Sequence, residues 1–240
     1  MLGLGASMSM PDRLFSLNDI SNLSLYLKNG VGITLDSGGA GGASQWDDSS
    51  GNAKHAVQAT TGDQAIPAEG GLTFELDEAD HYDLPSSINI VNTQGFTIFV
   101  VCKFQSMGDH GTILSLNGTA HFFEFKAGND DLRIKLGNSG TSIIFDDNNS
   151  FPNGEKFLLS LVRQKGVTGN LIARKNGIIL SQAEDGQKSN NKDAEFITIG
   201  TRNNDRYFDG TIHELAFYDK QLTDYELDDV HSYLIDKHGL

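Results

Sequence analysis

Residues 46–52 gather the side chains of this chain best suited to hold a metal ion. Two adjacent carboxylates, Asp47 and Asp48, are followed by Ser, Gly and the amide of Asn52. Hard cations such as Ca²⁺ prefer several oxygen ligands from carboxylates, amides and carbonyls, and a short loop can wrap these around one ion. We therefore expect Asp47, Asp48 and Asn52 to hold one structural Ca²⁺. The alternative is a turn in which the same side chains accept hydrogen bonds from local amides.

Two other polar segments, near residues 146–150 and 201–207, carry side chains of the kind that recognise hydroxyl-rich ligands. Asp, Asn and Arg offer hydrogen-bond donors and acceptors of fixed geometry, and a Tyr or Trp ring offers a flat apolar surface. The alternative for each segment is a solvated hairpin tip, and the alternative for the single Trp is packing in the core. The candidate ligand-binding residues are Trp46, Asp146, Asn148, Arg202, Asn204 and Tyr207.

Catalytic chemistry is less well supported than binding. A glycosidase needs two carboxylates about 5–5.5 Å apart, or wider, and on a strand Glu75 and Asp77 would share one face. A third acid in register is missing, and no Ser–His–Asp or Cys–His arrangement is visible. We therefore expect no catalytic residues, and a glycoside hydrolase is the least favoured function. Cys102 lies in an apolar run and is expected to be a buried, inert thiol.

Composition excludes several classes of function. The 240 residues include 18 Lys and Arg against 32 Asp and Glu, giving a formal net charge of −14. Binding to phosphate backbones requires clustered Lys and Arg, so nucleic acid is not an expected partner. A single Cys excludes an intrachain disulfide framework and a multi-Cys zinc site. No apolar run approaches the ~20 residues of a membrane span, and the apolar start has no basic residues of a secretory signal.

The elements that position these residues are predicted to be almost entirely strands. Short apolar and aromatic runs are separated by Gly- and Asn-rich turns, and the Gly-rich residues 36–54 are predicted to form a long surface loop. A helix is predicted to begin after Thr223, in a capping box with Glu226, and to end at Gly239. This pattern predicts an all-β sandwich. The predicted strands lie near residues 23–27, 72–76, 80–83, 95–104, 111–116, 121–126, 131–136, 141–145, 156–164, 169–175, 177–182, 195–201 and 207–218.

Several motifs resemble one known family. The run Gly210-Thr211-Ile212-His213-Glu214, with the turn and helix start that follow it, is similar to the close of concanavalin A-like or laminin G-like jelly-roll domains of the pentraxin-like superfamily. Residues 46–52 with His55-Ala56, residues 71–74 with Tyr82, and residues 195–200 are similar to further motifs of that family. The resemblance spans residues 24–240 and implies a two-sheet antiparallel jelly-roll sandwich with a short C-terminal helix. This architecture hosts lectins, glycosidases, adhesion modules and viral coat parts.

A second resemblance concerns the chain as a whole. Its apolar, Gly-rich start without a signal peptide, joined to a single jelly roll, resembles the small virion proteins of tailed bacteriophages. That resemblance implies a non-enzymatic capsid decoration, appendage or tail-fibre protein, made in the host cytoplasm, whose lectin-like domain contacts host-surface polysaccharide. The alternative is a bacterial carbohydrate-binding or adhesion module at the cell surface.

Residues 1–23 are predicted to form an N-terminal arm, and residues 24–240 the jelly-roll domain. The apolar side chains of the arm would not stay solvated without a partner. We therefore expect the arm to dock on another subunit. The expected protein partners are capsid or tail proteins and further copies of this chain in a homo-oligomer. The apolar side chains in question are Leu2, Leu4, Met8, Met10, Leu14, Phe15 and Leu17.

Overall fold

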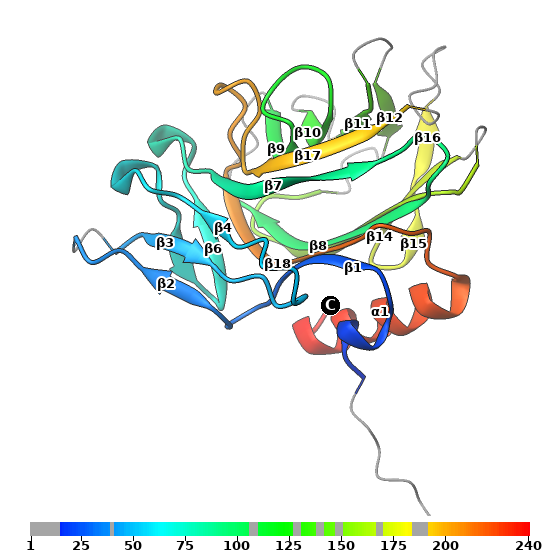
Figure 1. Cartoon of the computed structure of the whole chain (residues 1–240), viewed down its shortest axis with the longest axis horizontal. Helices are drawn as coiled ribbons and strands as arrows, with labels where there is room; N and C mark the ends of the chain where they lie inside the picture. The colour runs from blue at the N-terminus through cyan, green and yellow to red at the C-terminus, as the bar shows by residue number, and fades with distance from the viewer. Residues whose placement is uncertain are drawn as a thin grey trace, which may run out of the picture.

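The computed structural model describes residues 15–38, 41–105, 110–126, 131–137, 142–146, 151–166, 170–183 and 192–240, with backbone alone at 146 and 181–183. In these ranges the chain forms two antiparallel β-sheets stacked face to face, and one α-helix, α1 (Asp224–His238), lies below them (Figure 1). The expected all-β sandwich with a C-terminal helix is confirmed.

The described strands are divided between a sheet of eight and a sheet of ten. The eight-stranded sheet runs in the order β15 (Ile178–Ile179), β14 (Leu171–Lys175), β13 (Lys156–Arg163), β8 (Phe96–Phe104), β18 (Gly210–Tyr218), β6 (Gly71–Phe74) and β5 (Ile66–Ala68), with β1 (Leu23–Leu27) also paired to β18. The ten-stranded sheet runs in the order β16 (Ser181–Ala183), β12 (Ile143–Asp146), β11 (Asp131–Lys135), β10 (Phe122–Lys126), β9 (His110–Ser115), β17 (Ala194–Ile199), β7 (Tyr82–Ile90), β4 (Ala56–Val57), β3 (Ala43–Trp46) and β2 (Ile33–Leu35).

Apolar side chains fill the space between the two sheets. Side chains alternate along a strand, so Val100 and Cys102 of β8 face this core while Phe99 and Val101 face the opposite way. The expected burial of Cys102 is confirmed, and burial raises the pKa of its thiol, which keeps it inert.

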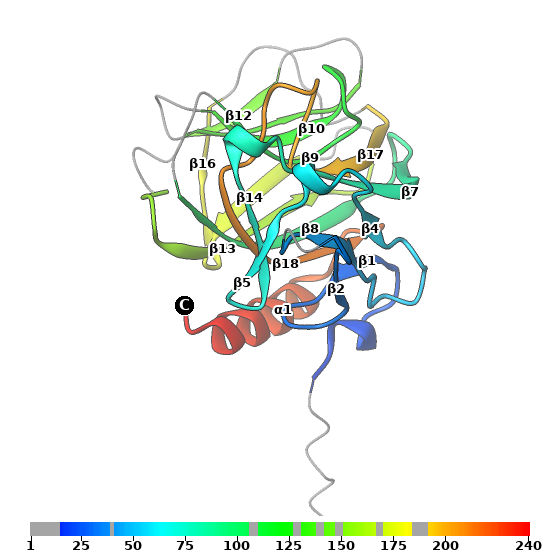
Figure 2. The same cartoon turned by 90° about the vertical axis from the view of Figure 1, so that its left-hand side faces the viewer.

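The outer face of the eight-stranded sheet is covered by α1. Leu227, Val230 and Leu234 of the helix pack with Phe99 and Val101 in a second apolar cluster, and Figure 2 shows the helix lying beneath β8 and β18. Because β8 is buried on both faces, its sequence is a continuous apolar run rather than an alternating one. The outer face of the ten-stranded sheet lies on the other side of the molecule, away from the helix (Figure 1).

Both ends of α1 form as predicted. The Thr223 side chain accepts a hydrogen bond from the backbone N–H of Glu226, and the Glu226 side chain accepts one from the backbone N–H of Thr223. Gly239 ends the helix with φ +65°, in the left-handed region that favours glycine. No helix among the described residues is long and apolar enough to cross a membrane.

The strand predictions fail mainly on one side of the sandwich. Residues 36–54, predicted to be a loop, contain β3, and the short strands β2, β4 and β5 were not predicted. These strands have two to four residues each and mixed exposure, which leaves little periodic signal. The strand predicted at 80–83 is longer, because β7 continues past Pro85 to Ile90, and a Pro normally indicates the end of a strand.

The described part of the N-terminal arm packs on the domain. A 3-10 turn (Leu17–Asp19) is capped by Ser16, and Leu17 joins the second apolar cluster, in which α1 packs on the eight-stranded sheet. The Tyr218 hydroxyl donates a hydrogen bond to the backbone O of Leu17 over 3.0 Å. Residues 1–14 lie outside the described residues, so docking of the arm on another subunit stays a prediction.

Candidate functional site

The candidate site begins with the alternation of side chains along β10. Phe123 and Phe125 face the core between the sheets, so Phe122, Glu124 and Lys126 lie on the outer face of the ten-stranded sheet. A carboxylate, a cation and an aromatic ring are thus brought to one side of a strand by the pleat alone.

Strand β11 adds two cations beside them. In the antiparallel register, Arg133 lies directly opposite Glu124, and Lys135 lies opposite Phe122. Directly opposed residues have their side chains about 5 Å apart on the same face. The register therefore places an arginine within reach of the Glu124 carboxylate.

Phe122, Lys126, Arg133 and Lys135 line a groove of about 520 Å³ on the outer face of the sheet. The groove is bounded by β9 to β12 and by the loop that follows β17. Five of the 18 Lys and Arg of the chain line it, although the chain as a whole has a net charge of −14. The lining residues are His110, Thr119, Phe122, Lys126, Arg133, Lys135, Ser142, Ile144, Arg202 and Arg206.

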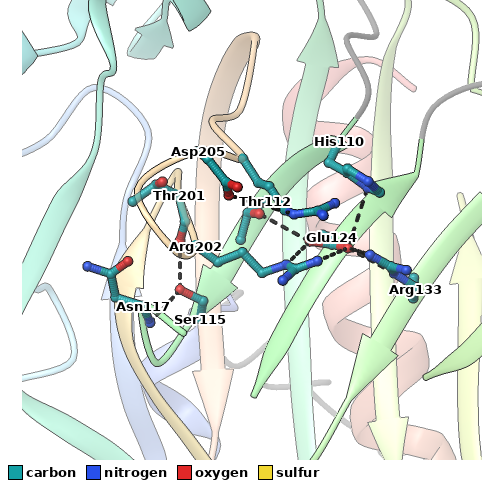
Figure 3. A network of polar contacts seen from close by, with 10 residues as sticks. His110, Thr112, Ser115, Asn117, Glu124, Arg133, Thr201, Arg202 and Asp205 are labelled. Atoms are coloured by element: carbon teal, nitrogen blue, oxygen red, sulfur yellow. Dashed lines mark hydrogen bonds and ion pairs between the residues drawn. The ribbon is translucent and has the colours of Figure 1, made fainter. Parts of the chain in front are cut away.

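Glu124 is fully buried and contacts two of the residues that line the groove, Arg133 and Arg202. Its Oε1 accepts hydrogen bonds from Arg133 Nε, over 2.8 Å, and from Arg133 Nη2. Arg202 approaches from the opposite side, with Nε donating to Oε2 and Nη2 donating to Oε1 over 3.1 Å (Figure 3). Thr112 Oγ1 donates to Oε2 over 3.3 Å. Both carboxylate oxygens are therefore engaged by protein donors.

The charges of this network set its protonation states. Burial on its own would raise the pKa of Glu124, but the hydrogen bonds and charges of Arg202 and Arg133 outweigh it, so the pKa is lowered and the carboxylate stays ionised. His110 Nδ1 lies 3.6 Å from Glu124 Oε1. Burial lowers the pKa of His110; Glu124 raises it, and the positive charges of Arg206 and the other two arginines lower it further.

An aromatic ring holds the two arginines in place. The Arg202 guanidinium lies over the Phe122 ring with its Cζ 4.0 Å from the ring centroid, and Arg133 Cζ lies 5.1 Å from the same centroid. Cation–π contacts and the Glu124 carboxylate together fix the plane of each guanidinium. The groove therefore presents a rigid, positively charged floor.

Local backbone geometry brings Arg202 into the groove. Gly200 turns the chain out of β17 with φ +88°, and a Cβ there would lie 2.6 Å from the Phe74 ring, so the position requires glycine. The Ser115 hydroxyl of β9 donates to the backbone O of Thr201 over 2.6 Å. The loop is therefore fastened to β9 directly beside Arg202 (Figure 3).

Of the residues predicted to bind a ligand, Arg202 alone is a described lining residue of this groove. Asn204 lies exposed on the same loop and accepts a hydrogen bond from Asn117 Nδ2 over 3.0 Å. Tyr207 is half-buried next to His81, with ring centroids 6.3 Å apart. Asp146 ends β12 with its side chain undescribed, and the predicted contribution of Asn148 lies outside the described residues.

The predicted sugar-stacking role of Trp46 is wrong. The side chain is 1% exposed in the core between the sheets, and its indole N–H donates to the backbone O of Lys28 over 3.2 Å. A ring buried on both faces offers no surface to a sugar, so the alternative of core packing holds.

In the predicted metal loop, Asp48 is used by hydrogen-bond donors of the protein. Its Oδ1 accepts from the backbone N–H groups of Tyr26 and Ser50, over 2.9 and 2.8 Å, and its Oδ2 accepts from Lys54 N–H and the Ser50 hydroxyl, over 3.0 and 2.8 Å. These contacts are those of the alternative interpretation, a turn organised by an Asp side chain. They also fasten the loop to β1.

The other two predicted metal ligands point to different partners. Asp47 Oδ1 accepts a hydrogen bond from Gln45 Nε2 over 2.6 Å, and Asn52 Nδ2 donates to the backbone O of Leu23 over 2.7 Å. Within the described ranges, no three His, Cys, Asp or Glu side chains are grouped to hold a metal ion. The structural Ca²⁺ at this loop stays a prediction.

The paired carboxylates considered for catalysis do not share a strand face. Strand β6 ends at Phe74, and residues Leu76–Glu78 form a 3-10 turn. The alternation that would place Glu75 and Asp77 on one side of a strand is therefore absent.

Comparison with known proteins identifies the family. A family model described as the concanavalin A-like lectin/glucanases superfamily matches residues 76–228, well over half of the chain. The chain belongs to this superfamily. No curated protein matches it in sequence.

Solved structures share the fold at low sequence identity. The binding domain of Paraclostridial Mosquitocidal Protein 1 aligns with a TM-score of 0.60 and 15% identity, covering 90% of this chain and 52% of that one. Domain 4 of AbnA, a GH43 extracellular arabinanase from Geobacillus stearothermophilus, in complex with arabinotriose, aligns with a TM-score of 0.59 and 16% identity, covering 88% and 98%. Trypanosoma rangeli sialidase aligns with a TM-score of 0.58 and 15% identity, covering 91% and 33%.

The extent of these matches differs. This chain spans about a third of the sialidase and about half of the mosquitocidal binding domain, but it matches nearly the whole of the arabinanase domain. At such identities the likeness is one of fold.

Proposed function

We propose that this protein is a non-enzymatic, lectin-like carbohydrate-binding domain whose ligand lies in the groove over β9 to β12. The observation that carries the proposal is the groove itself. It lies on the outer face opposite α1, and its volume of about 520 Å³ falls within the ~300–1,000 Å³ range of small-molecule sites.

The lining chemistry suits a saccharide. Sugar hydroxyls need directed donors and acceptors, which the Lys and Arg side chains and the hydroxyls of Thr119 and Ser142 supply. Ile144 adds an apolar contact for the C–H surface of a ring. Because the guanidiniums of Arg133 and Arg202 are already fixed by Glu124 and Phe122, binding costs little additional side-chain entropy.

The state of Glu124 supports binding rather than hydrolysis. A glycosidase acid must carry a proton at working pH and therefore needs a raised pKa, whereas the pKa of Glu124 is lowered. Its two oxygens are also occupied by arginine and threonine donors. No carboxylate is among the described residues that line the groove.

The comparisons support a carbohydrate ligand through the fold. The matching family is named for lectins and glucanases, and the structurally similar arabinanase domain is described in complex with arabinotriose. Fold likeness alone does not carry a ligand across, so the proposal rests on the groove.

We further propose that the domain serves in a bacteriophage virion, with a bacterial surface adhesion module as the alternative. The support is the overall resemblance of the sequence to small virion proteins. Mass spectrometry of purified particles tests it directly. Detection of the chain in virions supports the first role, and its detection in the cell envelope in the absence of particles supports the alternative.

A groove-filling variant tests the binding proposal and leaves Glu124, Arg133 and Arg202 themselves unsubstituted. Ile144 lies half-buried among the lining residues on β12, so Ile144→Trp should fill the groove and abolish binding on a glycan array. The matched control is Ile178→Trp on β15 of the other sheet, where the native side chain is 73% exposed. Equal glycan binding by both variants, or no glycan bound by the wild type, would overturn the proposal.

A further inference from the structure

The positive charge of the groove exceeds what the protein itself neutralises. Five cationic side chains line it. Glu124 offers one negative charge to the two arginines that it contacts, Asp205 lies 3.7 Å from Arg206, and Asp131 lies opposite Lys126 in the β10–β11 register. Counting the described side chains alone, three carboxylates stand against five cations, and the lining keeps a net positive charge.

The cations divide into two groups by what they contact. Arg133 and Arg202 are committed to Glu124 and to the Phe122 ring. Lys126, Lys135 and Arg206 are half-buried and line the groove without touching that carboxylate. The second group is therefore available to a ligand.

Arg206 carries a buried donor that is free to meet a ligand. Its Nη1 has no hydrogen-bond partner among the described residues, and its Nε lies 3.7 Å from Asp205, beyond hydrogen-bond distance. Burial lowers the pKa of Arg206, and the neighbouring charge of Arg202 lowers it further. A buried donor without a partner is costly, and an oxyanion would both accept its hydrogen bond and relieve the crowding of positive charge. Within the part of the chain that the structure describes, Nδ1 of His110 likewise has no hydrogen-bond partner.

We propose that the groove selects anionic glycans, binding the oxyanion of a uronate or a sulfate ester through Arg206, Lys126 and Lys135. This inference rests on the proposed function and specifies its ligand class. A guanidinium matches the two oxygens of a carboxylate or sulfate group in a fork geometry, and an ammonium adds a point charge. The net charge of −14 repels an acidic polymer from the rest of the surface, so the groove would also fix where the polymer binds.

Affinity electrophoresis of the full chain provides the test. We expect polygalacturonate in the gel to retard the protein and its fully methyl-esterified form not to. A parallel comparison of dextran sulfate with plain dextran distinguishes sulfate from carboxylate. Because a hydrogen bond to a charged group contributes to the binding free energy, Arg206→Gln should weaken binding about tenfold. The double variant Arg206→Gln with Lys135→Gln should weaken binding further. The charge-matched control is Lys165→Gln, an exposed Lys beside a different cavity, which should bind as the wild type does.

The possible results separate this inference from the proposed function. Retention of the acidic polymers over their neutral forms, lost in the Arg206 variants and kept in Lys165→Gln, supports anion selection. Equal binding of neutral and acidic forms, abolished by Ile144→Trp, overturns the inference and leaves the glycan groove standing. Equal loss in Lys165→Gln also overturns it, because the contact would then be a general charge effect.

Discussion

Glu124 is the residue on which the rigidity of the groove depends, and Glu124→Gln tests this. The substitution keeps the side-chain volume but removes the negative charge that two guanidiniums share. Arg202 is only 5% exposed, so it would be left as a buried charge without its counterion. Breaking a buried ion pair costs about 3–5 kcal/mol. Arg133 is more exposed and can turn to solvent, so we expect the lower end, a loss of about 3 kcal/mol in the free energy of unfolding.

Urea unfolding followed by fluorescence measures this loss well, because the single Trp, Trp46, is buried in the core. The control is Glu155→Gln at an exposed position, which should change stability by less than about 0.5 kcal/mol. The pKa of Glu124 is lowered from 4.5, so its contribution is present above that pH and is lost as the pH falls through the lowered value. The difference between wild type and variant should therefore shrink in acid. A loss below about 1 kcal/mol at pH 7 would refute the claim that Glu124 is a buried carboxylate that stabilises the two arginines by its charge.

Three further predictions concern other parts of the molecule. Burial raises the pKa of Asp80 from 3.8 to about 6. The stability tied to its protonated form is therefore present below about pH 4 and is lost as the pH rises through about 6. In thermal unfolding, Asp80→Asn should stabilise the fold by up to about 3 kcal/mol at pH 8 and by little at pH 4. Buried Glu214 accepts hydrogen bonds from Tyr26 and from Lys237 and lies 2.6 Å from His238 Nε2, so Glu214→Gln should cost about 3 kcal/mol and speed hydrogen exchange at the end of α1; unchanged exchange there would contradict its anchoring role. If the loop of Asp48 is a turn, Asp48→Ala should lower the melting temperature equally in millimolar calcium and in chelator, whereas a calcium-dependent rise in the wild type alone would instead support the predicted ion.

Strongly patterned elements could be predicted from the sequence. Strand β8 is a long apolar run, the sequence of β18 carries the Gly210–Glu214 motif, and α1 carries a capping box, a helical apolar stripe and a terminal Gly. Short strands such as β4, with two residues, are set by their neighbours rather than by their own residues, and such tertiary control leaves no local signal. The continuation of β7 past Pro85 is a different case, because a Pro is a local signal for the end of a strand and the tertiary pairing overrides it.

The groove could be predicted only in part. Arg202 was predicted from its polar loop, but its partners Glu124 and Arg133 come from β10 and β11, and their meeting depends on a register that one sequence does not reveal. The alternation around Phe122 and Glu124 does indicate a strand with one polar face. It does not indicate that α1 covers the other sheet and leaves this face open. Core packing and sugar stacking both stayed open for Trp46, because a Trp suits either role, and only its burial separates the two.

The central claim, that glycans bind in the groove over β9 to β12, is tested most directly by nuclear magnetic resonance of the isotope-labelled chain. The glycan that binds most strongly on the array is titrated into the protein, and the backbone amide shifts are followed. The account predicts saturable shifts concentrated in residues 110–112, 122–126, 131–135 and 202–206, with α1 and β15 unaffected. Saturable shifts confined to α1 and the eight-stranded sheet would contradict it.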